Sequence, residues 1–207
     1  MYLIRNILLL GLVTIAFSAC STLSKSECLT ANWKTIGYGD GTKGYKASRI
    51  SQHRSACAEY AVQPDLNAYN TGREEGLHQY CIPTAAYNKG LSGYQYNGVC
   101  AGYNERAFIA AFNHGLTIYK AKTRLKNLKN KYTEEQSYIA DLESQLHEKE
   151  DRLVSGKLSK VKALMLLNET KEMAEELGKA KSNLEHLDNR IYKQAQHIKY
   201  LKNQNIN

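Results

Sequence analysis

The sequence predicts a mainly α protein: a small disulfide-stapled helical head with little β structure, then a long antiparallel coiled-coil hairpin. All 14 glycines except Gly11, Gly156 and Gly178 lie between residues 37 and 115, as do both prolines. Beyond that region apolar residues recur every three or four positions with few helix breakers, which is typical of a coiled coil. Four cysteines within the head predict the staples.

The N-terminal segment has the parts of a secretory signal peptide over residues 1–19. Arg5 supplies the positive charge, residues 7–17 form an apolar run, and small residues precede Cys20. The run is too short to cross a bilayer, which needs roughly 20 apolar residues. Phe17-Ser18-Ala19-Cys20 resembles the bacterial lipoprotein signal, which implies cleavage and acylation of Cys20 with groups such as palmitate. Ordinary cleavage with an incidental Cys20 is the alternative.

The charge balance bears on location and partners. Without residues 1–19 the chain carries 27 basic and 20 acidic side chains, a net charge of +7. Secretion argues against a nucleic-acid partner, so we expect anionic lipid or peptidoglycan as neighbours. The alternative is that the charge only keeps the arm soluble. By resemblance to the lipoprotein sorting pattern, Ser21 implies the outer membrane, facing the periplasm.

The other four cysteines are Cys28, Cys57, Cys81 and Cys100. An even set in an exported protein predicts two disulfides with three possible pairings. Sequence proximity favours Cys28–Cys57 with Cys81–Cys100. The alternative is zinc held by these thiolates with His53 and His78, but no tight Cys-x-x-Cys occurs. We therefore predict no metal and no cofactor.

Helical spacing recurs through the predicted head domain, residues 20–118. Helices are expected over residues 47–61, from the N-cap Asp65 to Tyr80, from Pro83 to Gly90, and from Asn104 onward. Residues 91–99 are expected to form a loop or a small hairpin.

Two glycine patterns stand out in the head. Residues 37–41 read Gly-Tyr-Gly-Asp-Gly, which predicts a tight turn in which Asp40 bonds its own backbone. The pattern aromatic-Asn-x-Gly ends at Gly72, Gly90 and Gly115. Its spacing is unequal, so no regular solenoid is predicted; we interpret it as a way of ending or kinking helices.

Many of these positions carry a family resemblance. It runs through Trp33-Lys34-Thr35-Ile36-Gly37-Tyr38-Gly39-Asp40-Gly41, Tyr69-Asn70-x-Gly72-Arg73-x-x-Gly76-Leu77-x-x-Tyr80-Cys81 and Gly93-x-x-Tyr96-x-x-Val99-Cys100. Over about residues 28–116 the chain resembles the proteobacterial lipoproteins built on domain of unknown function 2799. The resemblance implies an envelope lipoprotein and no particular activity.

No catalytic motif is present: the sequence has no Gly-x-Ser-x-Gly, no His-Glu-x-x-His and no phosphate-binding glycine loop. We therefore predict that the protein is not an enzyme, and that His53 and His78 are partly exposed surface residues. A Tyr-rich head is also compatible with a binding module. The possible binding residues are Tyr38, Asp40, Tyr69, Arg73 and Tyr96.

Residues 119–207 are predicted to form the coiled-coil hairpin. The first apolar seam is Leu125, Leu128, Tyr132, Ile139, Leu142, Leu146 and Leu153, with Glu135 and Lys149 filling two positions. The second is Ala163, Leu166, Thr170, Met173, Leu177, Ala180, Leu184, Leu187, Ile191, Gln194, Ile198 and Leu201. Gly156 breaks the phase and predicts the turn.

Folding back at Gly156 would set Leu125 near Leu187, Tyr132 near Ala180 and Ile139 near Met173. The alternative is one continuous helix that forms a homo-oligomer in parallel. The six basic residues of 120–131, with no acidic one, are positioned to touch anionic lipid or to form a solvated face.

Together these features predict an outer-membrane-anchored periplasmic lipoprotein with a structural or interaction role in the cell envelope. Its partners would be the membrane, through the lipid on Cys20, and an envelope protein or peptidoglycan. The alternative is a glycan- or peptide-binding module that uses the coiled coil as a spacer or dimeriser.

Overall fold

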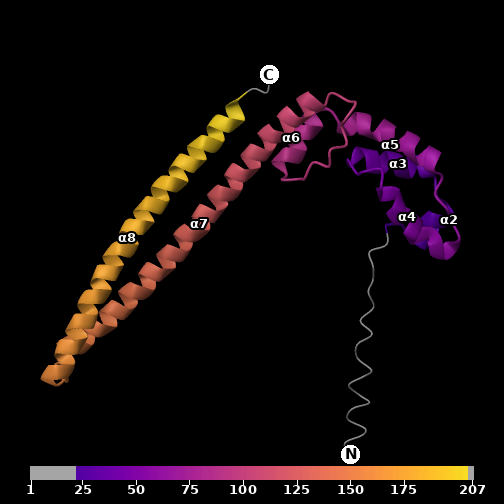
Figure 1. The fold of residues 1–207 in the computed structure, drawn as a ribbon. Helices are drawn as coiled ribbons and strands as arrows, with labels where there is room; N and C mark the ends of the chain where they lie inside the picture. The colour runs from indigo at the N-terminus through magenta and orange to yellow at the C-terminus, as the bar shows by residue number, and fades with distance from the viewer. Residues whose placement is uncertain (1–21, 205–207) are drawn as a thin grey trace, which may run out of the picture. The chain divides into compact units, whose positions relative to one another are not determined.

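A computed structural model describes residues 22–204, and all regular elements within them are helices, so the mainly α prediction is confirmed. The predicted signal peptide and Cys20 lie outside the described residues. The chain forms two units (Figure 1). The first comprises residues up to Ala85 with Tyr96–Phe108, and the second comprises Ala86–Gln95 with Ile109 onward. No helix between residues 22 and 204 is long and apolar enough to cross a membrane.

Helices of 15 residues or fewer build the first unit. In chain order they are α2 (Lys25–Leu29), α3 (Trp33–Thr42), α4 (Arg49–Cys57), the 3-10 helix η1 (Ala58–Tyr60) and α5 (Leu66–Tyr80). Ser24 and Glu27 form a capping box at α2, and Asp65 accepts hydrogen bonds from two backbone N–H groups at the start of α5. The predicted N-cap at Asp65 is therefore confirmed, and the helix predicted over 47–61 is α4 followed by η1.

Both predicted disulfides are present, Cys28–Cys57 and Cys81–Cys100. The first links α2 to the end of α4 inside the apolar cluster of this unit. That cluster consists of Leu23, Cys28, Trp33, Ile50, Cys57 and Tyr69. Because all four thiols are in disulfides, the alternative zinc sets have no thiolate ligands left.

Helices α3 and α5 pack backbone to backbone. A Cβ added at Gly37 would collide with the carbonyl oxygen of Tyr69, and one at Gly72 with the carbonyl oxygen of Lys34. The turn predicted over residues 37–41 is wrong, since these residues are helical in α3. Close packing offsets the cost of glycine in a helix, about 1 kcal/mol per residue.

A second pair of helices follows the same pattern. These are α6 (Pro83–Leu91) and α7 (Glu105–Val154). Within the second unit, a Cβ at Gly90 would collide with the carbonyl oxygen of Phe112, and one at Gly115 with that of Tyr87. The prediction that aromatic-Asn-x-Gly ends or kinks helices is therefore wrong, because these glycines are helix contacts.

The turns after α3 and α6 are also equivalent. Gly44 and Gly93 both have φ +72°, and a Cβ on either would strike a tyrosine ring, Tyr80 and Tyr119 respectively. Their N–H groups donate to the carbonyl oxygens of Gly41 and Gly90, each at 2.9 Å. The chain thus contains one helix-pair motif twice, and within the segment 91–99 the residues after Leu91 form a loop, not a hairpin.

The arm is a hairpin of α7 and α8 (Lys160–Asn203), which run side by side in Figure 1. Over residues 125–153 the side chains that are not exposed are those of the predicted first seam. Over residues 160–203 they are those of the second. Gly156 has φ +68° and Ser159 caps α8, so the turn is confirmed.

The hairpin register differs from the predicted one. Glu135 lies opposite Asn183, and Lys149 pairs with Glu169, so the register is shifted by about six residues, or nearly two helical turns. Ile139 accordingly packs in one cluster with Leu177 and Ala180. The boundary predicted at residue 118 falls inside α7, which is continuous there.

Candidate functional site

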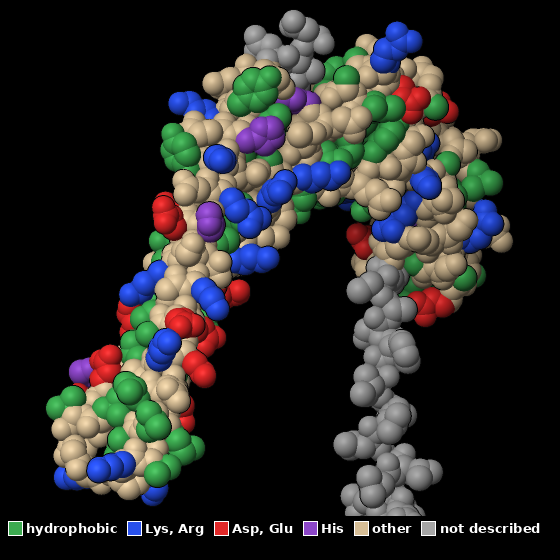
Figure 2. Space-filling model, turned by 60° about the vertical axis from the view of Figure 1, so that its left-hand side comes forward, with side chains coloured by type: hydrophobic (Ala, Val, Ile, Leu, Met, Phe, Trp, Pro, Cys, Tyr) green, Lys and Arg blue, Asp and Glu red, His purple; other side chains and the backbone are tan. Residues whose placement is uncertain are grey.

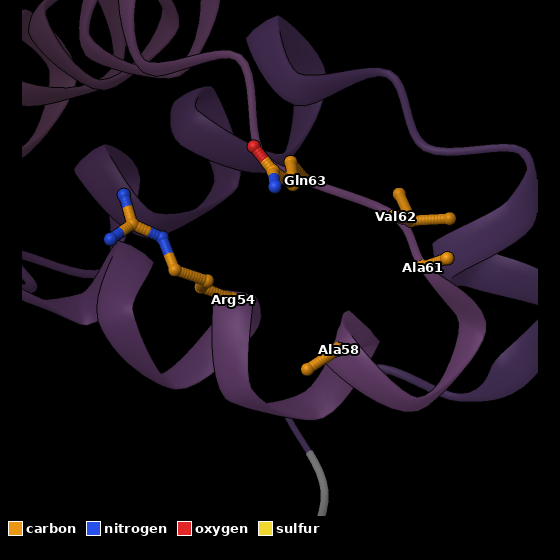
Figure 3. Close-up of a pocket in the computed structure, with 5 residues that line it drawn as sticks. All are labelled: Arg54, Ala58, Ala61, Val62 and Gln63. Atoms are coloured by element: carbon orange, nitrogen blue, oxygen red, sulfur yellow. The ribbon is translucent and has the colours of Figure 1, made fainter.

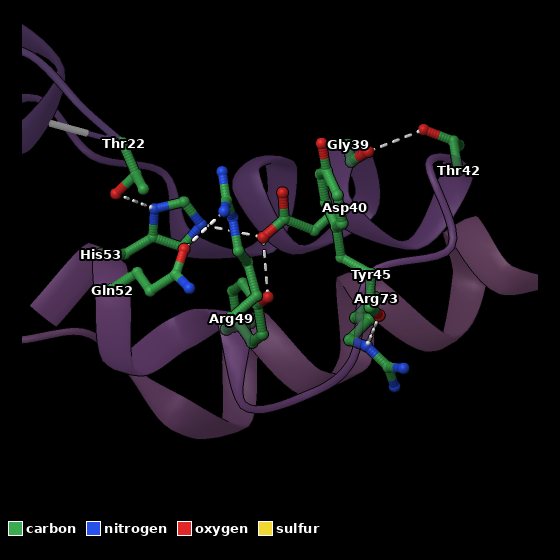
Figure 4. A network of polar contacts seen from close by, with 10 residues as sticks. Thr22, Gly39, Asp40, Thr42, Tyr45, Arg49, Gln52, His53 and Arg73 are labelled. Carbon is green, nitrogen blue, oxygen red and sulfur yellow. Dashed lines mark hydrogen bonds and ion pairs between the residues drawn. The ribbon is translucent and has the colours of Figure 1, made fainter. Parts of the chain in front are cut away.

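A buried polar network occupies the centre of the first unit (Figure 4). Asp40 of α3 and His53 of α4 are 6% and 3% exposed and lie 2.8 Å apart, from Oδ2 to Nε2. Tyr69 of α5 donates its hydroxyl to the same oxygen at 2.7 Å. The other ring nitrogen of His53, Nδ1, lies 2.9 Å from the hydroxyl of Thr22.

The electrostatics of the network favour a charged Asp40. Burial alone would raise the pKa of Asp40, but hydrogen bonds from His53 and Tyr69 and the charges of His53 and Arg49 hold it below its ordinary value. Burial raises the pKa of Tyr69, and its hydrogen bond to Asp40 raises it further. Tyr69 therefore stays a neutral donor to a carboxylate.

Sequence reasoning placed two of these residues wrongly. Asp40 does not bond its own backbone, and His53 is not a surface residue. His53 lies three residues after Ile50 and four before Cys57, and both of these are buried. Spacing of this kind puts three side chains on one helix face, a signal that could have identified His53 as buried. His78 is exposed, as predicted, with its ring against that of Tyr103.

The five predicted binding residues do not form one cleft. Asp40 and Tyr69 meet in the buried network. Tyr38 is 43% exposed, and Arg73 donates through Nε to the carbonyl oxygen of Tyr45. Tyr96 donates its hydroxyl to Glu105 and accepts from the backbone N–H of Cys100, so it braces the second disulfide loop.

None of the three hollows considered next is lined by a predicted binding residue. The first of these, about 560 Å³, lies beside α4 and η1 (Figure 3). Its lining is Arg54, Ala58, Ala61, Val62 and Gln63. One in the arm, about 430 Å³, is lined mainly by charged side chains. Asp40 and His53 thus lie within hydrogen-bonding distance but outside these hollows.

The third hollow, about 200 Å³, is polar and basic. Its lining is Tyr45, Lys46, Ser48, Arg49, Gln52 and Asn97. The guanidinium of Arg49 lies 4.7 Å from the centre of the Tyr45 ring and bonds Gln52. Its Nε is buried without a hydrogen-bond partner among the described residues. This hollow matches an anionic group better than a neutral one.

No cluster of three or more His, Cys, Asp or Glu side chains suited to a metal ion occurs in residues 22–204. The polar side chains described above can donate and accept hydrogen bonds. In the buried network those groups are already paired with one another.

Comparison with known proteins bears on residues 32–117 alone. No curated protein and no solved structure matches the chain. Residues 32–117 match the model of the family described as a protein of unknown function, DUF2799. The matched segment starts at the N-cap of α3 and ends within α7, so it contains both helix-pair motifs. Residues 32–117 of this chain therefore match the DUF2799 family model, and the coiled-coil hairpin continues from the matched segment.

Proposed function

We propose that the protein is an outer-membrane-anchored periplasmic lipoprotein with a structural or interaction role in the cell envelope, in which the hairpin engages the partner. The signal sequence ending at Cys20 supports export and lipidation. Two disulfides in the head support an oxidising compartment.

One observation carries the interaction role. The hairpin is long, and the apolar seam residues of its two helices already pack against each other. Helices α7 and α8 have 50 and 44 residues, so they extend about 75 and 66 Å at 1.5 Å per residue. The side chains outside the seam are exposed along α8. Most of the surface of this long, stiff hairpin is exposed. This supports a role in reaching a partner or in holding it at a distance.

The test of this role shortens the hairpin without removing its end. Deleting residues 132–145 together with 170–183 removes two heptads from each helix and about 21 Å of length. We expect specific crosslinked products in intact cells for the full chain and their loss for the shortened chain. Identical products from both would contradict the proposal.

Anchoring is tested at Cys20. The intact mass of the mature protein should show acyl groups on residue 20, and Cys20→Ser should abolish this acylation. An uncleaved, unmodified N-terminus would contradict the proposal.

A second candidate function is recognition of an anionic glycan or peptide by the head. The basic hollow at Tyr45, Lys46 and Arg49 favours it. A carboxylate-bearing peptidoglycan fragment should shift the NMR signals of Tyr45 in the full mature chain. Lys46→Gln should weaken the shift and Lys43→Gln, outside the hollow, should not. Equal effects of both variants would exclude a specific site.

A further inference from the structure

The free end of the hairpin exposes aliphatic side chains that its own fold does not use. Val154, at the end of α7, is 86% exposed. Val161, Leu164, Met165 and Leu167, in the first turns of α8, are 54–70% exposed. We call these five residues the tip patch. Elsewhere in residues 119–204 the exposed large apolar side chains are all tyrosines.

The tip patch is separate from the seam. Leu166 is 6% exposed and Ala163 half-buried, and these two already fill the seam at this end. Val161, Leu164 and Met165 follow the spacing i, i+3, i+4, which puts them on another face of α8. Contiguous exposed aliphatic side chains of this kind mark an interaction surface.

The charged side chains near the tip patch are basic. Residues 152–167 contain four basic side chains and no acidic one. They are Arg152, Lys157, Lys160 and Lys162, all exposed. The three lysines form no ion pair with any residue in the described part of the chain. Figure 2 shows green side chains gathered at this end of the hairpin with blue beside them.

We propose that the tip patch inserts into the interface of a bilayer that contains anionic lipids. The aliphatic side chains would enter the acyl boundary while the lysines extend to the phosphate groups. A second copy of the chain is disfavoured, because a tip-to-tip contact would bring the three lysines of one copy against those of the other.

This inference deepens the proposed function, on which it rests, by naming what the end of the hairpin contacts. Together with an acyl group on Cys20 it would give the chain two separate membrane contacts. Lipid binding by the tip is measured without that acyl group, so it can fail while the envelope role stands.

The experiment uses the full mature chain carrying Cys20→Ser, so that no acyl chain contributes. Its co-sedimentation is measured with vesicles of phosphatidylethanolamine and phosphatidylglycerol, and with vesicles of phosphatidylcholine alone. We expect binding to the anionic vesicles. The variant Val161→Gln/Leu164→Gln/Met165→Gln should bind at least tenfold more weakly. The matched control Tyr192→Gln/Tyr200→Gln, on exposed positions of the same helix, should bind like the parent chain.

Charge is tested separately with Lys157→Gln/Lys160→Gln/Lys162→Gln. Each lysine removed should weaken binding to anionic vesicles roughly fivefold, with far-UV circular dichroism unchanged. Absence of vesicle binding by the parent, or equal binding by the patch variant, would overturn the proposal. So would a dimer of the parent that the patch variant abolishes, because the patch would then be a self-association surface. If vesicle binding is absent but the shortened hairpin still loses its crosslinks, only the lipid assignment fails.

Discussion

Asp40 and His53 face each other in the interior of the first unit, 2.8 Å apart and each more than nine-tenths buried. Removing such a pair from water is unfavourable unless the remaining polar atoms are also bonded. Here Tyr69 bonds Asp40 and Thr22 bonds His53. The network therefore fixes α3, α4 and α5 against one another and ties Thr22 to α4.

Removing the carboxylate should be the most damaging single change in this network. Asp40→Ala leaves His53 and the Tyr69 hydroxyl buried without their partner, so we expect the free energy of unfolding to fall by about 3 kcal/mol. Tyr69→Phe leaves the Asp40–His53 pair intact and should cost about 1.5 kcal/mol. Urea unfolding followed by circular dichroism measures both. Equal losses would show that the pair itself contributes nothing.

Stability should fall in acid through Asp40. Because its pKa is lower in the folded than in the unfolded state, its contribution is complete above the unfolded value, about 3.9. That contribution declines as the pH falls from there through the folded pKa. The free energy of unfolding of the parent minus that of Asp40→Asn should therefore shrink below about pH 4. A difference that stays constant from pH 7 to pH 2 would contradict a lowered pKa.

Close packing of α3 on α5 predicts opposite effects for two neighbouring glycines. Gly37→Ala places a methyl group against the backbone of Tyr69 and should destabilise the protein by about 2 kcal/mol. Gly39→Ala has no atom within 4 Å of the new methyl group and should stabilise α3 by up to about 1 kcal/mol. Thermal unfolding of the two variants decides the matter. If both are stabilising, α3 does not approach α5 as closely as described.

The sequence alone predicted the features that depend on local periodicity. The seams of α7 and α8, the cap at Asp65 and the turn at Gly156 follow from spacing and residue type. The hairpin register did not, because a seam with uniform spacing of three and four residues matches its partner almost equally well after a slip of about one heptad, which is nearly two helical turns. The bonds of Glu135 and Lys149 distinguish the two registers.

The buried network and the helix pairs could not be predicted from the sequence for another reason. Glycines such as Gly37 and Gly41 indicate turns when only local propensity is considered, and only a partner helix makes them favourable in α3. Asp40, His53 and Tyr69 come from three helices, so their meeting depends on tertiary packing. The repeated spacing from glycine to tyrosine, Gly76 to Tyr80 and Gly115 to Tyr119, was the available signal for the motif.

The two disulfides should each stabilise the folded protein. Cys28–Cys57 and Cys81–Cys100 span 29 and 19 residues of sequence, so each should contribute roughly 3 kcal/mol by restricting the unfolded chain. Replacing either pair with alanine should lower the urea midpoint. The single variant Cys57→Ala also lacks the crosslink but keeps the Cys28 sulfur. Comparing it with the double variant separates the loss of the crosslink from the loss of sulfur packing.

The same four thiols report the compartment in which the chain folds. Protein recovered from cells under alkylating conditions should carry no label on Cys28, Cys57, Cys81 or Cys100, because these thiols form disulfides in the oxidising compartment to which the chain is exported. A form kept in the cytosol by deleting residues 1–19 should be labelled at these positions. Full labelling of the parent protein would contradict both the pairing and export. Labelling of one pair alone would identify the cysteine pair that stays reduced.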